Sequence, residues 1–141
     1  RIMVEALETV IEQQVGELEQ ALQARFLPLK DKPYFVFHDA YAYLEEYLGI
    51  KHRDVFSLSH EVQPGARHVN ELRAKLRDAG RACVFSEPQF TPRLVNSLTA
   101  GLPVESAQLD PLGADTPASA DGYVHMLSTL TDNLGGCLES L

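Results

Sequence analysis

Apolar residues recur at helical spacing along the first 27 positions of the chain. Seven of them follow one another at steps of three or four residues: Val4, Leu7, Ile11, Val15, Leu18, Leu22 and Phe26. This spacing predicts one long amphipathic helix from about Ile2 to Leu27, which Pro28 closes. At 1.5 Å per residue such a helix spans roughly 35–40 Å. A helix of that length with one polar face usually braces a domain or joins two.

After this helix, strand-like and helix-like patterns alternate four times. The predicted strands are Tyr34–His38, Asp54–Ser59, Ala82–Ser86 and Val104–Leu109, of which the second is the weakest. The predicted helices are Ala40–Leu48, about Gly65–Ala79, one that starts after Thr91, and about Asp121–Leu138. Turn chemistry marks their ends, with Gly49, Gly80 and Gly101 as stops and Thr91–Pro92 as a helix start. Gly135 and Gly136 are expected to loosen the last helix near its end.

The alternation predicts the fold class. A long N-terminal helix followed by β and α segments in turn indicates an α/β fold with a four-stranded, parallel, doubly wound sheet and helices on both faces. The runs "YFVF" and "ACVF" are continuously apolar, as strands buried on both faces should be. The stretch 110–122 is the most linker-like segment.

Composition and charge exclude some classes of protein. The chain has 141 residues, enough for one domain with a substantial core. Its 12 Lys and Arg are outweighed by 20 Asp and Glu, for a net charge of -8, which argues against a general nucleic-acid binder. No apolar run is long enough to span a membrane, so we expect a soluble chain.

The N-terminus and the cysteines bear on the compartment. The chain starts in helical rhythm without Met or an export signal, so we expect a fragment that lacks its N-terminal part. Cys83 and Cys137 fit no CxxC motif. They are either two buried thiols or one disulfide of an exported protein, and their spacing leaves both interpretations open.

Polar residues follow each predicted strand where it ends. They are, strand by strand, His38 and Asp39; Ser59, His60 and Glu61; Ser86 and Glu87; and Asp110. In open α/β sheets ligands bind outside the carboxyl ends of the strands, so this edge is the candidate site. A structural alternative exists, because Asp39 and Glu87 could simply cap the helices that follow them. His52, His68 and His125 fall on predicted turns or helices and are expected at the surface.

Imidazole and carboxylate together suit more than one chemistry. They suit zinc, or manganese if oxygen ligands dominate. His38 and Asp110 could instead act as acid and base in a hydrolase. The Gly-x-Ser-x-Gly, Walker, His-Glu-x-x-His and dinucleotide-binding motifs are all absent from the sequence, which lowers the case for an enzyme.

Four motifs in order resemble the C-terminal lobe of the ZnuA family, the periplasmic zinc-binding components of bacterial zinc ABC importers. They are "YFVFHDAYAYLEEYLG", "EVQPGA", "CVFSEPQF" and "LDPLG". The resemblance covers essentially the whole chain. It implies two α/β lobes joined by a long helix, with metal bound in the cleft. Residues 1–28 would be that linking helix and 29–141 the C-terminal metal-binding lobe, with the N-terminal lobe and its histidine ligands absent from this chain.

The resemblance also implies roles for individual residues. The family's metal-binding histidine falls on His38, where relatives selective for manganese carry a carboxylate, so His38 favours zinc. The aspartate of "LDPLG" falls on Asp110, as a ligand or next to one. The family's cysteine pair falls on Cys83 and Cys137 and is implied to be a disulfide, whereas His60 gains no role. Side chains that could hold the ring of a zinc-bound histidine are Asp39, Ser59, Glu61 and Glu87.

The function implied by the resemblance is zinc capture without catalysis. The chain would bind Zn²⁺ as transported ligand in the periplasm and deliver it to a membrane ABC permease. Its partners would be zinc, the permease and the missing N-terminal lobe, and not nucleic acid. The alternatives are a manganese-binding lobe of the same type and a hydrolase that uses His38 and Asp110.

Overall fold

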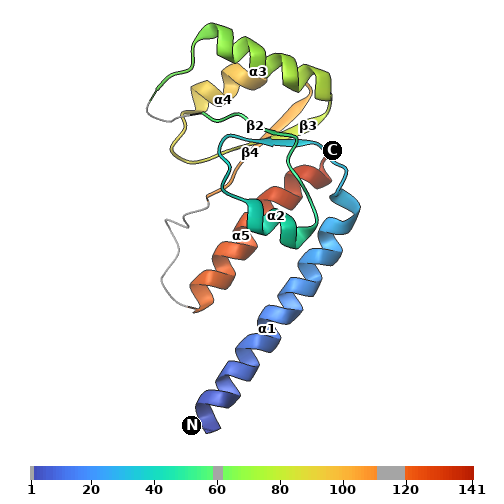
Figure 1. The fold of residues 1–141 in the computed structure, drawn as a ribbon, viewed down its shortest axis with the longest axis vertical. Coiled ribbons are helices and arrows are strands. Elements are labelled where there is room, and N and C mark those ends of the chain that lie inside the picture. Colours follow the sequence, from blue (N-terminus) through green and yellow to red (C-terminus); the bar gives the residue numbers. More distant parts are fainter. Residues whose placement is uncertain (1, 59–61, 111–119) are drawn as a thin grey trace.

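The computed structural model describes residues 2–58, 62–110 and 120–141. Helices and strands alternate along these residues (Figure 1). In chain order they are α1 (Ile2–Phe26), a 3-10 turn (Leu27–Leu29), β1 (Tyr34–Val36), α2 (Ala42–Leu48), β2 (Asp54–Val55), α3 (Ala66–Ala79), β3 (Ala82–Ser86), α4 (Pro92–Thr99), β4 (Val104–Gln108) and α5 (Ala120–Glu139).

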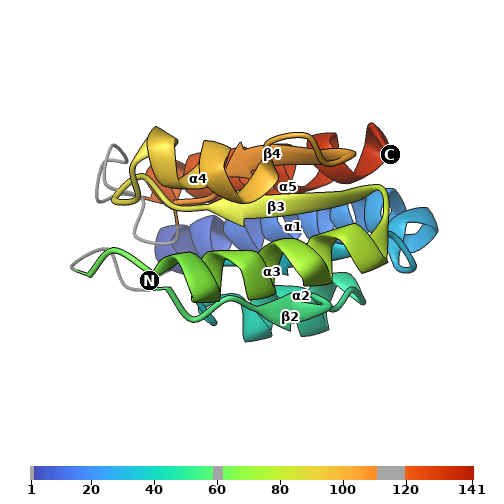
Figure 2. The ribbon, with the colours of Figure 1, turned by 90° about the horizontal axis from the view of Figure 1, so that it is seen from above.

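The four strands form one parallel sheet in the order β2-β1-β3-β4. β1 lies between β2 and β3, and its register places Val36 beside Val55 on one side and Phe85 on the other. Figure 2 looks onto the layer of α3 and α4, with α1, α2 and α5 beyond the sheet. The predicted α/β class with a four-stranded parallel sheet is confirmed.

Both faces of the sheet are buried, which explains the continuous apolar runs. Along β1 the side chains alternate, so that Tyr34 and Val36 pack with α1, α2 and α5, while Phe35 and Phe37 pack with α3 and α4. All of these side chains are at most 4% exposed. Alternate side chains of one strand thus belong to two different cores, one on each face of the sheet, as a doubly wound fold requires.

The C-terminal part of α1 packs on the domain. Figure 1 shows its N-terminal half extending beyond the sheet and the other helices. Leu22 and Phe26 are buried against α5, and Arg25 binds Asp132 and Glu139 of α5 at 2.7 Å each. Hydrogen bonds to these carboxylates raise the pKa of Arg25, and the bond to Glu139 has the larger effect. No helix within the described ranges combines the length and apolarity that a membrane span requires.

The disulfide decides between the two interpretations of the cysteines. Cys83 and Cys137 are bonded, with Cα atoms 6.3 Å apart, so that α5 is covalently tied to β3. α5 continues through Gly135 and Gly136 to Glu139, so the two glycines do not interrupt the helix. A Cβ on Gly135 would lie 3.1 Å from Cζ of Phe26. Gly135 therefore lets α1 approach α5 closely.

Three elements are shorter by two residues or more than the sequence pattern predicts. β1 ends at Val36 because the chain turns after Phe37, where the Ala40 amide donates to the His38 carbonyl at 3.0 Å. α2 consequently begins at Ala42 rather than Ala40. β2 ends at Val55 because Ser57 adopts a left-handed φ of 53° and bends the chain.

Candidate metal-binding site

The ends of β1, β3 and β4 bring three predicted site residues to one edge of the sheet. Pairing continues one residue past β1, since the Phe37 amide donates to the Phe85 carbonyl at 3.2 Å. Val36 of β1 pairs with Phe85 of β3. If this register continued for two more residues, His38 would lie opposite Glu87. On the other side the Leu109 amide donates to the Ser86 carbonyl at 2.8 Å. Asp110 follows directly and is half-buried.

His38 presents an exposed ring from a rigid support. Its neighbour Phe37 is 1% exposed and anchors the chain in the core beside Phe56 and Phe90. The His38 side chain itself is 62% exposed, and its Nδ1 lies 3.6 Å from Oε2 of Glu87. That separation is longer than a hydrogen bond. The ring is thus accessible to a ligand on one side and close to a carboxylate on the other.

Glu87 is a buried carboxylate with one oxygen unpaired. The residue is 2% exposed, and its Oε1 accepts a hydrogen bond from Nε2 of Gln89 at 2.8 Å. Its Oε2 makes no hydrogen bond to the described residues, and the same holds for the buried hydroxyl of Tyr41. Buried polar atoms without a partner are uncommon, and each calls for a reason.

Tyr41 lies near two carboxylates of the site. The residue is 6% exposed. Burial first, and then the negative charges of Glu87 and Asp110, raise the pKa of its hydroxyl. The phenol therefore stays neutral, and both carboxylates lie near enough to act on it. His38, Tyr41, Glu87 and Asp110 thus belong to one polar cluster at the carboxyl edge of the sheet.

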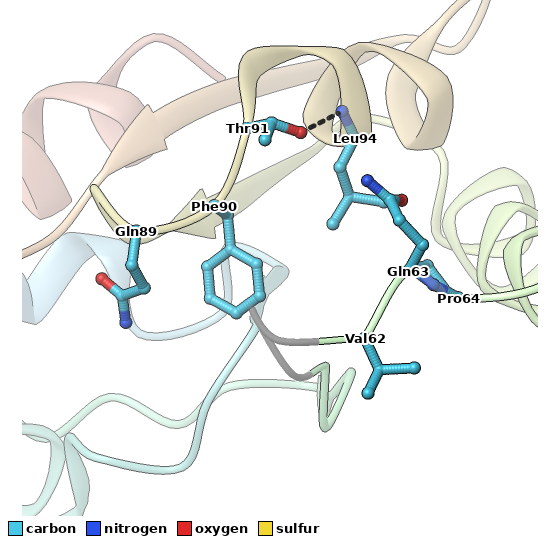
Figure 3. A pocket seen from close by; sticks show the side chains of 7 residues that line it. All are labelled: Val62, Gln63, Pro64, Gln89, Phe90, Thr91 and Leu94. Carbon is cyan, nitrogen blue, oxygen red and sulfur yellow. Dashed lines mark hydrogen bonds between the residues drawn. The ribbon is translucent and has the colours of Figure 1, made fainter.

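The capping interpretations of Asp39 and Glu87 are wrong. The residue before α2 is Tyr41, which makes no side-chain cap, and Asp39 is exposed. At α4 the hydroxyl of Thr91 accepts from the Leu94 amide at 3.2 Å, as the sequence predicts (Figure 3). Glu87 therefore caps no helix. Ser59, His60 and Glu61 lie outside the described residues, so their predicted places at the edge stay predictions.

A small pocket adjoins this edge, between the segment 62–64 and the start of α4 (Figure 3). Its walls are formed by Val62, Gln63, Pro64, Gln89, Phe90, Thr91 and Leu94. Gln89 belongs to both places, because it lines the pocket and holds Oε1 of Glu87. The pocket thus shares one wall with the cluster.

A second buried polar cluster was missed in the sequence. His52 was expected at the surface, but its side chain is 9% exposed and its Nδ1 lies 2.8 Å from Oε2 of Glu45. Glu45 is 3% exposed and also accepts from the hydroxyl of Tyr34. Glu45 lies four residues after Tyr41 and three before Leu48, on the apolar face of α2, and that position was the available signal. His68 and His125 are exposed, as predicted.

The described part of the chain offers few metal ligands. Within residues 2–58, 62–110 and 120–141 no three side chains of His, Cys, Asp or Glu gather closely enough to hold a metal ion. Of the predicted ligands at the carboxyl edge, His38 is exposed and Asp110 is half-buried. The imidazole follows β1 and the carboxylate follows β4, with β3 between them, and together they would supply two of the four ligands of a tetrahedral zinc site.

Comparison with known proteins identifies relatives over nearly the whole chain. Residues 5–137 match the family model described as "Zinc-uptake complex component A periplasmic". The chain is 38% identical over 128 residues to the high-affinity zinc uptake system protein ZnuA of Yersinia pestis. The aligned region covers 91% of this chain and 40% of that protein. The chain thus spans about 40% of the length of this relative.

Solved structures share the fold. The laminin-binding adhesin Lmb from Streptococcus agalactiae superposes with a TM-score of 0.68 at 21% identity, over 89% of this chain and 47% of that one. The solute-binding protein FpvC from Pseudomonas aeruginosa, in complex with Mn²⁺, gives a TM-score of 0.64 at 19% identity, over 86% and 46% of the two chains. At these identities the likeness establishes the fold alone.

Proposed function

Because the chain belongs to the ZnuA family of periplasmic zinc-uptake components, we propose that it captures zinc outside the cytoplasm and delivers it to an ABC permease in the membrane. The periplasm is the proposed compartment, and the Cys83–Cys137 disulfide is in keeping with an exported protein. The family is a transport component, and we propose no catalytic role for His38 or Asp110.

One observation carries the proposal: an exposed imidazole stands at the end of a buried strand beside carboxylates from the next two strands. His38 is 62% exposed although Phe37 is 1% exposed. His38 is the proposed direct zinc ligand, and Asp110 is a second ligand or lies next to one. Nitrogen and carboxylate oxygen are both ordinary zinc ligands.

Two ligands leave the zinc site incomplete, which supports a two-lobed protein. Zinc in proteins usually has four ligands. We propose that residues 1–28 are the helix that joins two lobes, that residues 29–141 are the C-terminal metal-binding lobe, and that an N-terminal lobe supplies the remaining ligands. The proposal is supported by the 40% share of the relative's length that the chain spans, and by the part of α1 that extends beyond the domain (Figure 1).

Manganese is the second candidate ligand. A protein of the same fold, FpvC, is known in complex with Mn²⁺. Manganese prefers sites dominated by oxygen, whereas zinc binds imidazole well. The ring of His38 therefore favours zinc. Competition between the two metals at a fixed pH distinguishes these candidates, and preference for manganese would contradict the zinc proposal.

The proposal is tested by calorimetric titration of zinc into the longer protein that joins this chain to its N-terminal lobe. His38→Ala should weaken binding by a factor of ten or more, because one of four ligands is lost. His68→Ala is the matched control, since His68 is exposed on α3 and should leave the affinity unchanged. Equal affinity of His38→Ala and the parent would contradict the assignment of His38.

A further inference from the structure

We propose that Glu87 is the positioning residue for His38. Its Oε2 accepts a hydrogen bond from Nδ1–H of the ring and thereby leaves Nε2 unprotonated for the metal. This inference rests on the proposed function for the identity of the ligand. It assigns a role to a buried residue that touches no metal itself. Zinc binding by His38 needs a free ring nitrogen, and Glu87 determines which nitrogen that is.

The two oxygens of Glu87 differ in their partners, and this difference supports the inference. Oε1 is already engaged, because Nε2 of Gln89 donates to it at 2.8 Å. Oε2 is buried and makes no hydrogen bond among the described residues. The nitrogen of His38 that faces Oε2, at 3.6 Å, is Nδ1. The unpaired oxygen therefore points at one ring nitrogen, while the ring as a whole is 62% exposed.

A carboxylate in this place selects the tautomer of the ring. A neutral imidazole carries one proton, and the nitrogen that has a hydrogen-bond acceptor keeps it. A buried carboxylate exerts this preference strongly, because few other groups can satisfy its lone pairs. The 3.6 Å separation closes to hydrogen-bond length by a small turn of the exposed ring, as contacts in ligand-free sites often tighten on binding. Metal-bound histidines usually have such a partner on the other nitrogen.

The other candidates for this role are less well placed in the described residues. Asp39 follows His38 directly but is exposed, so water competes for its oxygens. Tyr41 is a neutral phenol whose raised pKa keeps the proton on the oxygen. Its hydroxyl makes no hydrogen bond among the described residues, and a neutral phenol is a weaker acceptor for Nδ1–H than the carboxylate of Glu87. Glu87 is the acceptor that is both buried and directed at the ring.

The substitution Glu87→Gln should reverse the tautomer while keeping the shape of the side chain. Gln89 donates to Oε1, so an amide at position 87 would turn its oxygen toward Gln89 and its NH₂ group toward His38. An NH₂ group is a donor, and Nδ1 would then have to accept. The proton would move to Nε2, the nitrogen that the metal needs. Glu71→Gln is the matched control, because Glu71 is a 59% exposed residue of α3.

The tautomer is read directly by long-range ¹H–¹⁵N correlation spectra of the ¹⁵N-labelled, metal-free chain. The spectra are recorded at about pH 8.5, two units above the ordinary histidine pKa. His38 should show a protonated Nδ1 and an unprotonated Nε2 in the parent and in Glu71→Gln. In Glu87→Gln the two ¹⁵N shifts should exchange. A protonated Nε2 in the parent would overturn the inference, even if Glu87→Gln failed to fold. Unchanged shifts in a folded Glu87→Gln would overturn it too.

Zinc titration of the two-lobed protein gives the functional readout. Loss of such a partner typically weakens metal binding by about 10–100-fold, so we expect this loss for Glu87→Gln and none for Glu71→Gln. Equal affinity of Glu87→Gln and the parent would contradict a positioning role. The two proposals fail separately: if the tautomer reverses as expected but the parent binds no zinc, the positioning stands and the zinc function fails.

Discussion

Removal of the Cys83–Cys137 disulfide should destabilise the domain by about 4 kcal/mol. The bond joins residues 54 positions apart, and in the chain-entropy model a loop of that length is worth about 4 kcal/mol. This is a large share of the 5–15 kcal/mol that stabilises an ordinary domain. It should lower the Tm by roughly 10–15 °C in a chain of this size. Because Cys83 is fully buried, replacement by alanine on both sides avoids a stranded polar group.

Urea denaturation of the parent and of the double variant Cys83→Ala/Cys137→Ala measures this difference. The m-value should rise in the variant, because its unfolded chain is no longer held compact by the loop. Thiol counting on the unfolded, unreduced parent should find no free thiol. As a control, reductant should destabilise the parent and leave the double variant unchanged. A difference below about 1 kcal/mol between parent and variant would refute the loop argument.

Two further predictions concern helix packing and pH. Gly136→Ala should stabilise α5 by about 0.5–1 kcal/mol, since a Cβ there meets nothing within 4 Å. Gly135→Ala should not, because its Cβ would lie 3.1 Å from the ring of Phe26; equal gains in urea denaturation would contradict this packing. Lys75 lies 2.6 Å from Asp54 and is the main cause of the lowered pKa of that carboxyl. Lys75→Met should therefore cost less than about 1 kcal/mol at pH 7. The loss should disappear as pH falls through the lowered pKa of Asp54, and a difference that persists at pH 2 would count against the ion pair.

The sheet could be predicted because burial on both faces leaves a local signature. Tyr34–Val36 and Ala82–Ser86 are wholly buried strands, and their residues are almost all apolar. β2 was harder to read, since it lies at the edge of the sheet, is two residues long and is only half-buried. The strand order and the contact of Arg25 with α5 depend on distant parts of the chain. Neither feature can be predicted from a local sequence pattern.

The candidate site was predictable in its place and not in its internal arrangement. The rule for parallel sheets brings His38, Glu87 and Asp110 to one edge, and the structure places them there. The sequence could not distinguish the exposed Asp39 from the buried Glu87. That difference arises from the turn after Phe37 and from the depth at which β3 lies between its neighbours. Tyr41 was missed because the sequence placed it inside the helix predicted from Ala40, where a tyrosine ordinarily belongs to the core.

The cysteines show the same limit. A spacing of 54 residues does not determine how close two side chains lie in the fold. The residues alone therefore did not decide between two free thiols and one disulfide. The family resemblance implied the bond. In the fold, β3 is a central strand and α5 packs across it, so the two Cα atoms come within 6.3 Å.

The most direct test of the central claim is to locate zinc in the two-lobed protein by anomalous diffraction at the zinc absorption edge. We predict one strong peak at the carboxyl edge of this sheet, about 2.0–2.1 Å from Nε2 of His38. Asp110 should contact the ion directly or through one intervening group, and Nδ1 of His38 should lie within hydrogen-bond distance of Glu87. A zinc peak remote from His38 in the loaded protein would contradict the account.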